Sequence, residues 1–113
     1  MTSFILVTTR FEGIHFYENA PEEVAFLRFP HRHEFHVSVG LAVTHDDREL
    51  EFILVKRSLD QYISTWGINF GGKSCEMMAK DIIQFLFGRY GKRSCSVKVS
   101  EDGENGAVVE HVQ

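Results

Sequence analysis

The sequence predicts an α+β protein with the order strand, strand, helix, helix, strand, strand. Three observations support this prediction. Apolar residues alternate with a period of two over residues 33–44, repeat with helical spacing over 55–66 and 79–90, and alternate again over 94–102. Because the two helical segments lie between two pairs of strands, we expect a four-stranded antiparallel sheet with both helices on one face.

The first two strands are expected to form a long antiparallel pair. Residues 3–11 are β-branched and aromatic, and residues 12–17 extend this strand after a bend at Gly13. The second strand covers residues 33–44, and a polar turn follows at 45–49. Its inward face should carry His33, Phe35, Val37, Val39, Leu41 and Val43.

Two helices and two further strands follow. From Val55 the period becomes helical, and the apolar stripe runs to Trp66. Ser74 is a suitable N-cap for the second helix, which ends at Gly91. The last two strands are predicted at 94–102, with Cys95, Val97 and Val99 on one face, and at 107–112.

Composition limits the classes of function. The 113 residues fit one domain, 1–113, and the formal net charge of -4 argues against a nucleic-acid binder. The sequence shows no basic leader and no long apolar run, so we expect a cytoplasmic protein that does not bind a membrane. Cys75 and Cys95 match no cysteine metal motif and are expected to be free thiols.

Three histidines could form a metal site. His31 and His33 are two residues apart at the start of a strand, so both side chains should point to one face. His15, late in the neighbouring strand, is the natural third ligand for Zn²⁺. His36 has the opposite parity and should face away. The alternative is that residues 31–36 form only a solvated strand entry.

Several motifs in order resemble one protein family. FEGIH at 11–15, HRHEFHVSV at 31–39, LEFILVKRSLDQYI at 50–63, SCEMMAKDIIQFL at 74–86 and VKVSEDGENGAVVE at 97–110 carry the likeness. Together they resemble the 6-pyruvoyltetrahydropterin synthase and 6-carboxytetrahydropterin synthase (QueD-like) family, over most of the chain. Members of that family have the tunnelling fold, whose ββααββ order is the one predicted above.

The resemblance implies a site and an assembly. It implies that His15, His31 and His33 hold zinc and that Glu101 accepts hydrogen bonds from a pterin-like or purine-like ring. It also places Ser74 and Cys75 in the ligand pocket, and it implies a homo-oligomer, a trimer or hexamer, with sites between subunits. On the residues alone, Glu101 could be a charged strand end and Cys75 a small buried helix residue.

The chain departs from the family where protons are transferred. Family enzymes use a cysteine four residues before the first histidine of the pair, and Leu27 stands there. The family's Asp-His pair between the helices is missing from residues 64–73, and Arg32 replaces the glycine between the paired histidines. A leucine cannot transfer protons, so these changes favour binding without the standard reaction.

Three functions are therefore compared. The first is a zinc protein that binds a pterin or purine-type small molecule, with the standard lyase reaction in doubt. The second is an active zinc-dependent lyase on dihydroneopterin triphosphate, in which His36, Glu34 or Cys75 replaces the missing proton carriers. The third is a non-catalytic structural or interaction protein on the same scaffold, in which the histidines bind no metal.

Overall fold

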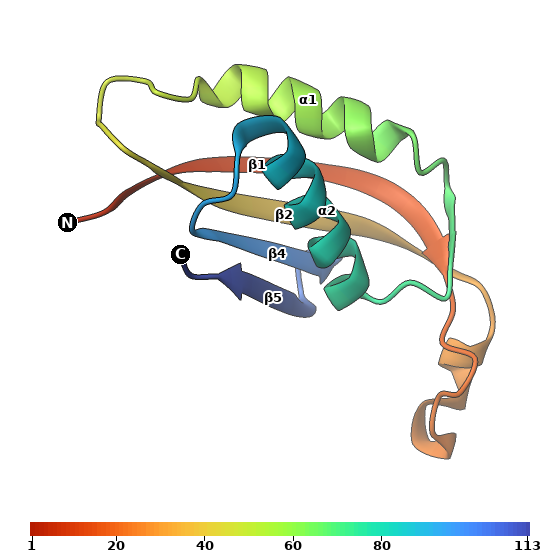
Figure 1. Cartoon of the computed structure of the whole chain (residues 1–113). Helices are drawn as coiled ribbons and strands as arrows, with labels where there is room; N and C mark the ends of the chain where they lie inside the picture. The colour runs from red at the N-terminus through yellow and green to blue at the C-terminus, as the bar shows by residue number, and fades with distance from the viewer.

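A computed structural model describes residues 1–113, and it has one twisted sheet covered on one face by two helices (Figure 1). The strand order in the sheet is β3-β1-β2-β4-β5. The elements in chain order are β1 (Ser3–His15), the 3-10 helix η1 (Glu22–Arg28), β2 (His31–Val43), α1 (Phe52–Ser64), β3 (Asn69–Gly71), α2 (Cys75–Tyr90), β4 (Cys95–Glu101) and β5 (Asn105–His111). The predicted α+β class is confirmed.

The long β1–β2 pair is confirmed, and its register aligns the ends of both strands. Ser3 pairs with Val43 at one end and His15 with His31 at the other. The predicted bend at Gly13 is wrong, because β1 continues without a break through this residue. A side chain at Gly13 would overlap the ring of Phe70, so the glycine permits close packing rather than a bend.

The sheet has five strands instead of the four predicted. The extra strand, β3, lies in the segment expected to be a loop, and it runs parallel to the end of β1. The amide of Ile14 donates to the carbonyl of Ile68 at 2.7 Å, and the amide of Phe16 donates to the carbonyl of Gly71 at 2.9 Å. A strand of three residues has no detectable period, which is why the sequence pattern did not predict it.

The second helix follows the prediction more closely than the first. Ser74 caps α2 by accepting a hydrogen bond from the amide of Met77, and Gly91 ends the helix. Helix α1 begins at Phe52, three residues before the predicted start at Val55. The carboxylate of Glu51 accepts a hydrogen bond from the amide of Leu54 at 2.8 Å, which starts the helix earlier.

The core lies between the sheet and the two helices. The inward face predicted for β2 is buried from Phe35 to Leu41, and Val97 and Val99 of β4 continue it. Side chains from both helices complete the core: Val55, Leu59, Ile63, Met78, Ala79, Ile82, Ile83 and Leu86. Cys75 and Cys95 are free and buried. Neither helix has the length and apolar character that crossing a membrane requires.

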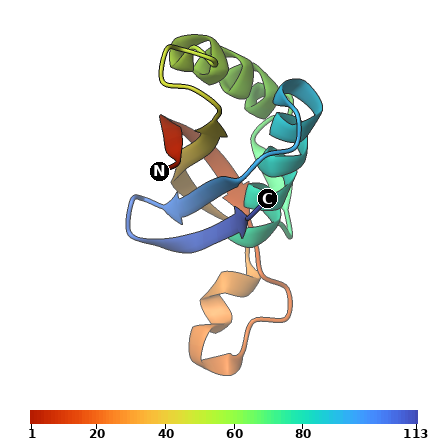
Figure 2. The same ribbon diagram turned by 60° about the vertical axis from the view of Figure 1, so that its left-hand side comes forward.

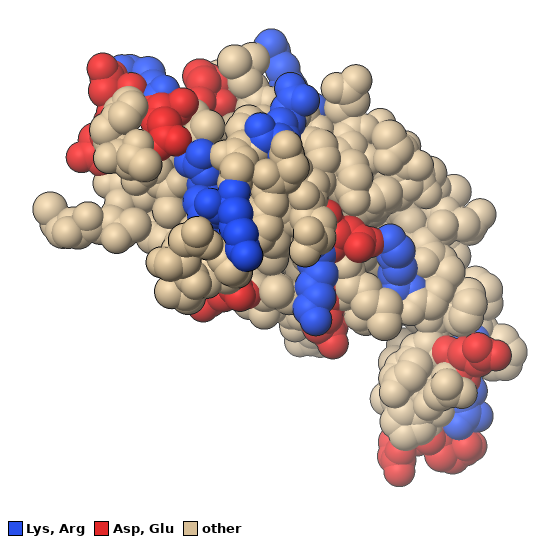
Figure 3. All heavy atoms as spheres, in the orientation of Figure 1, with Lys and Arg blue, Asp and Glu red and all other residues tan.

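Residues 16–30 form an arm that projects from the end of the sheet, and both ribbon views show it apart from the helices (Figure 2). The arm is closed on itself, since the amide of Tyr17 donates to the carbonyl of Leu27 at 2.7 Å. Phe26 and Phe29 are each 71% exposed. Acidic side chains gather on the arm and at the opposite end of the molecule, each time with some basic ones among them, and most of the basic side chains in this view lie between these two ends (Figure 3).

Candidate metal centre and adjoining pocket

The three predicted metal ligands meet at the end of the sheet next to the arm. His15 ends β1 and is the register partner of His31, which begins β2, and His33 follows two residues later on the same face. The ring centroids are 4.6 Å apart for His15–His31, 5.0 Å for His31–His33 and 5.4 Å for His15–His33. The buried ring of Phe35 lies beneath His15 and His33.

Each histidine ring is held by its Nδ1 atom. The Nδ1 of His15 lies 2.8 Å from the carbonyl oxygen of Lys73, and that of His31 lies 2.8 Å from the carbonyl oxygen of Phe29. The Nδ1 of His33 lies 2.8 Å from Oδ2 of Asp102. A carbonyl or carboxylate oxygen only accepts, so the proton of each neutral ring sits on Nδ1 and the lone pair on Nε2.

The donor set fits a zinc ion. Nε2 of His15 and Nε2 of His33 are buried and have no hydrogen-bond partner. Such buried polar atoms are costly unless something binds them. One ligand atom from each of His15, His31 and His33 lies within 4.8 Å of the other two. Three neutral imidazoles, each held by an outer oxygen, are a common zinc ligand set that leaves a fourth position open.

Glu101 lies between the histidines and a cavity. It ends β4 opposite Phe35, so its side chain shares the inward face. Its Oε2 is 3.1 Å from Nε2 of His15, and its Oε1 is 3.6 Å from Nε2 of His33. Neither approach is a hydrogen bond, since both nitrogen atoms remain without a partner. The carboxylate can therefore accept hydrogen bonds from another group.

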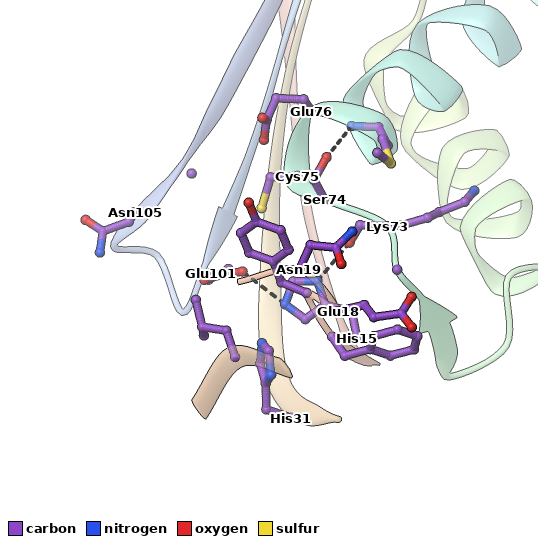
Figure 4. A pocket seen from close by; sticks show the side chains of 16 residues that line it. His15, Glu18, Asn19, His31, Lys73, Ser74, Cys75, Glu76, Glu101 and Asn105 are labelled. Carbon is purple, nitrogen blue, oxygen red and sulfur yellow. Dashed lines mark hydrogen bonds and ion pairs between the residues drawn. The ribbon is translucent and has the colours of Figure 1, made fainter. Parts of the chain in front are cut away.

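A cavity of about 700 Å³ opens beside the histidines, between the arm and the start of α2. His15, His31 and Glu101 line it, as do the predicted ligand-binding residues Ser74 and Cys75 (Figure 4). The other lining residues are Phe16, Tyr17, Glu18, Asn19, Leu27, Gly72, Lys73, Glu76, Met77, Asn105 and Gly106. This volume suits a small organic molecule.

The charged groups of the cavity are mostly acidic. Glu18, Glu76 and Glu101 line it, and Lys73 is the single lysine or arginine there. The side chain of Lys73 points away from the histidines (Figure 4) and forms an ion pair with Asp81. Burial, followed by the charges of Glu101 and Glu76, raises the pKa of the Cys75 thiol to about 11. The thiol is therefore protonated at neutral pH.

Two predicted substitutes for the missing proton carriers lie elsewhere. Glu34 and His36 alternate with the inward residues of β2, and they contact each other at 2.9 Å between Oε1 and Nε2. Arg32 also lies outside the site, because its side chain pairs with Glu12 of the neighbouring strand. Leu27, which replaces the family cysteine, does line the cavity.

Sequence reasoning missed Asp102, which contacts His33. This residue follows Glu101 directly in the turn between β4 and β5. Hydrogen bonds from the amide of Glu34 and from His33 lower the pKa of its carboxyl group. The one available signal was its position beside Glu101, since the sequence does not show how that turn folds back over β2.

The arrangement of strands and helices described above is that of the tunnelling fold. A solved structure assigned as a dihydroneopterin aldolase (FolB) from Vibrio cholerae O1 biovar El Tor matches the chain with a TM-score of 0.61 and 14% sequence identity. The match covers 98% of this chain and 99% of that one. No protein-family profile and no curated protein sequence matches the chain. At 14% identity the structural match supports the fold and not the narrower synthase family.

Proposed function

We propose that this protein binds zinc through His15, His31 and His33 and holds a pterin or purine-type small molecule in the adjoining cavity. It would be a relative of the 6-pyruvoyltetrahydropterin and 6-carboxytetrahydropterin synthases that has lost their standard lyase reaction. The observation that carries this proposal is the convergence of three imidazoles whose Nδ1 atoms are all occupied by outer oxygens. Two of these rings, those of His15 and His31, line a cavity of ligand size.

Glu101 is the proposed anchor for the ring. Pterin and purine rings present adjacent N–H donors, and a carboxylate accepts two such donors side by side. The carboxylate lines the cavity, and its side chain is 31% exposed, so a ligand could reach it. The structurally similar protein from Vibrio cholerae is assigned to act on dihydroneopterin, a pterin, which agrees coarsely with this ligand class.

The proton carriers of the resembled family are missing from this chain, which supports binding without the standard reaction. Leu27, which stands at the sequence position of the resembled family's cysteine, lines the cavity. Glu34 and His36 lie on the other face of the sheet. The Cys75 thiol has a pKa of about 11, so it is a weak acid and very little of it is present as the thiolate that could act as a base.

The second candidate is an active lyase. A bound zinc ion would act as a Lewis acid on oxygen atoms of a substrate side chain. Of the three substitutes considered for proton transfer, only Cys75 lines the cavity. Among these three, Cys75 is therefore the residue that the active alternative would use, and Cys75→Ser would abolish any turnover that it supports.

Two measurements test the proposed function. The metal content of the purified protein should show one zinc per chain, and native mass spectrometry should identify a pterin or purine-type molecule that is carried through purification or added afterwards. Incubation with dihydroneopterin triphosphate should give no product by mass spectrometry. Zinc-dependent turnover would favour the active lyase instead, while absence of zinc would favour the third candidate, a structural or interaction protein.

The resemblance also supports a homo-oligomer, either a trimer or a hexamer. Strand β5 is the last in the sheet, and β3 covers β1 only near Ile14 and His15, so both edges have unpaired backbone groups. Native mass spectrometry should therefore give a mass that is three or six times the 13.0 kDa of the chain. A monomer would contradict this part of the proposal.

A further inference from the structure

The turn between β4 and β5 places one side chain behind His33. Asp102 accepts a hydrogen bond from Nδ1 of His33 at 2.8 Å and another from the backbone amide of Glu34 at 3.0 Å. Its own amide donates to the carbonyl of Glu34 at 2.7 Å. Backbone and side chain of Asp102 are thus both tied to β2 next to His33.

The backbone of Asp102 has a left-handed conformation. Its φ of 57° lies in the region that glycine adopts most readily and that aspartate tolerates better than most residues. The next residue, Gly103, also has a positive φ of 73°. A turn of this shape would accept glycine at position 102, so the turn itself does not require a carboxylate there.

The three histidines differ in what holds them. Backbone carbonyls hold the rings of His15 and His31, and those contacts follow from the fold. Only His33 depends on a side chain for its outer contact. Its orientation and tautomer are therefore set by the identity of residue 102.

We propose that Asp102 is the positioning residue of the site, which keeps the proton of His33 on Nδ1 and leaves Nε2 free to bind metal. This inference rests on the proposed zinc function, because the free Nε2 atom matters as a ligand. The competing role for Asp102 is mechanical: it would only fasten the β4–β5 turn to β2 through the Glu34 amide.

Two substitutions separate these roles. In Asp102→Asn the amide oxygen can keep the bond to Glu34, but the amide nitrogen then donates to Nδ1 of His33. Nδ1 must become an acceptor, so the proton moves to Nε2, where it blocks metal binding. Asp102→Gly removes the carboxylate without this reversal, and it suits the positive φ.

The two roles predict opposite orders for these variants. If Asp102 sets the tautomer, zinc affinity should fall by roughly 10- to 100-fold in Asp102→Asn, and by less in Asp102→Gly. If it only fastens the turn, Asp102→Asn should bind zinc like the parent protein and Asp102→Gly should be the weaker of the two. Competition with a chromophoric chelator measures the affinities, and Glu104→Gln, an exposed residue of the same turn, controls for the loss of one negative charge.

A second readout does not depend on zinc. Nitrogen chemical shifts of the imidazole rings report the tautomer in the metal-free protein at about pH 8, where an ordinary histidine is neutral. His33 should carry its proton on Nδ1 in the parent and on Nε2 in Asp102→Asn. An unchanged tautomer would overturn the role of Asp102. A changed tautomer in a protein that binds no zinc would support that role and refute the proposed metal function.

Discussion

His15 and His31 face each other as a register pair of β1 and β2, and their ring centroids are 4.6 Å apart. Their approach is a property of the hairpin, since a slip of one residue would send one ring to the opposite face of the sheet. The register that buries the core therefore also assembles two thirds of the proposed metal site.

Loss of any one of the three histidines should remove zinc. In each of the single variants His31→Ala and His33→Ala, two imidazoles remain, and two ligands seldom retain zinc against buffer and chelators. Elemental analysis of the purified variants should show well below one zinc per chain. His36→Ala is the matched control, because this histidine belongs to the same segment and pairs with Glu34 on the other face. Full zinc in both ligand variants would contradict the assignment.

Substitution of Glu101 should separate ring binding from metal binding. In Glu101→Gln the side chain keeps its shape but loses the charge that strengthens hydrogen bonds from ring N–H groups. A charge-assisted hydrogen bond contributes about 1.5–3 kcal/mol, so affinity for a pterin should fall by roughly 10- to 100-fold. Calorimetric titration with dihydroneopterin measures this, while zinc content should stay at one per chain. A loss of zinc would instead identify Glu101 as a fourth metal ligand.

Gly13→Ala should destabilise the protein. The new methyl group would overlap the ring of Phe70, which belongs to the core below the site. Overpacking of this kind typically costs about 1–3 kcal/mol of unfolding free energy. Urea denaturation measures the change, and Gly88→Ala in α2 is the matched control. That position has open space around it, so alanine there should be neutral or stabilising.

Acid should weaken the link between β2 and the end of α2. The backbone amide of Thr44, then the Arg93 side chain, lower the pKa of Glu49 from 4.5 to about 2. A carboxyl group with a depressed folded-state pKa stabilises the fold above its unfolded pKa and loses this contribution as pH falls toward 2. Unfolding measured between pH 5 and about 2 should therefore depend less on pH in Glu49→Gln. An equal dependence would show that Glu49 carries no part of it.

Much of the fold was predictable because alternation and helical spacing reflect burial directly. The inward face from His33 to Leu41 was correct, and so was the second helix with its Ser74 cap. The start of α1 was wrong because Phe52, Ile53 and Leu54 form an apolar run without a period, yet all three are exposed. Apolar identity alone does not reveal that a short run is the outer side of a first helical turn.

The candidate site was predictable in its main residues and not in their supports. Strand parity placed His31 and His33 on one face and His36 on the other. The contacts of their Nδ1 atoms involve Lys73, Phe29 and Asp102, and these depend on loops whose conformations follow from tertiary packing. No period in the sequence encodes such contacts.

The arm leaves the sheet directly after His15 and returns directly before His31. With zinc at the proposed site, one ion would cross-link the two ends of residues 16–30. Without the ion, only the backbone pairing of the hairpin and of the arm would hold these ends, which would raise the fraction of time in which the arm is open. Nicking of the arm by a protease would then report metal occupancy, without a substrate or a spectroscopic probe.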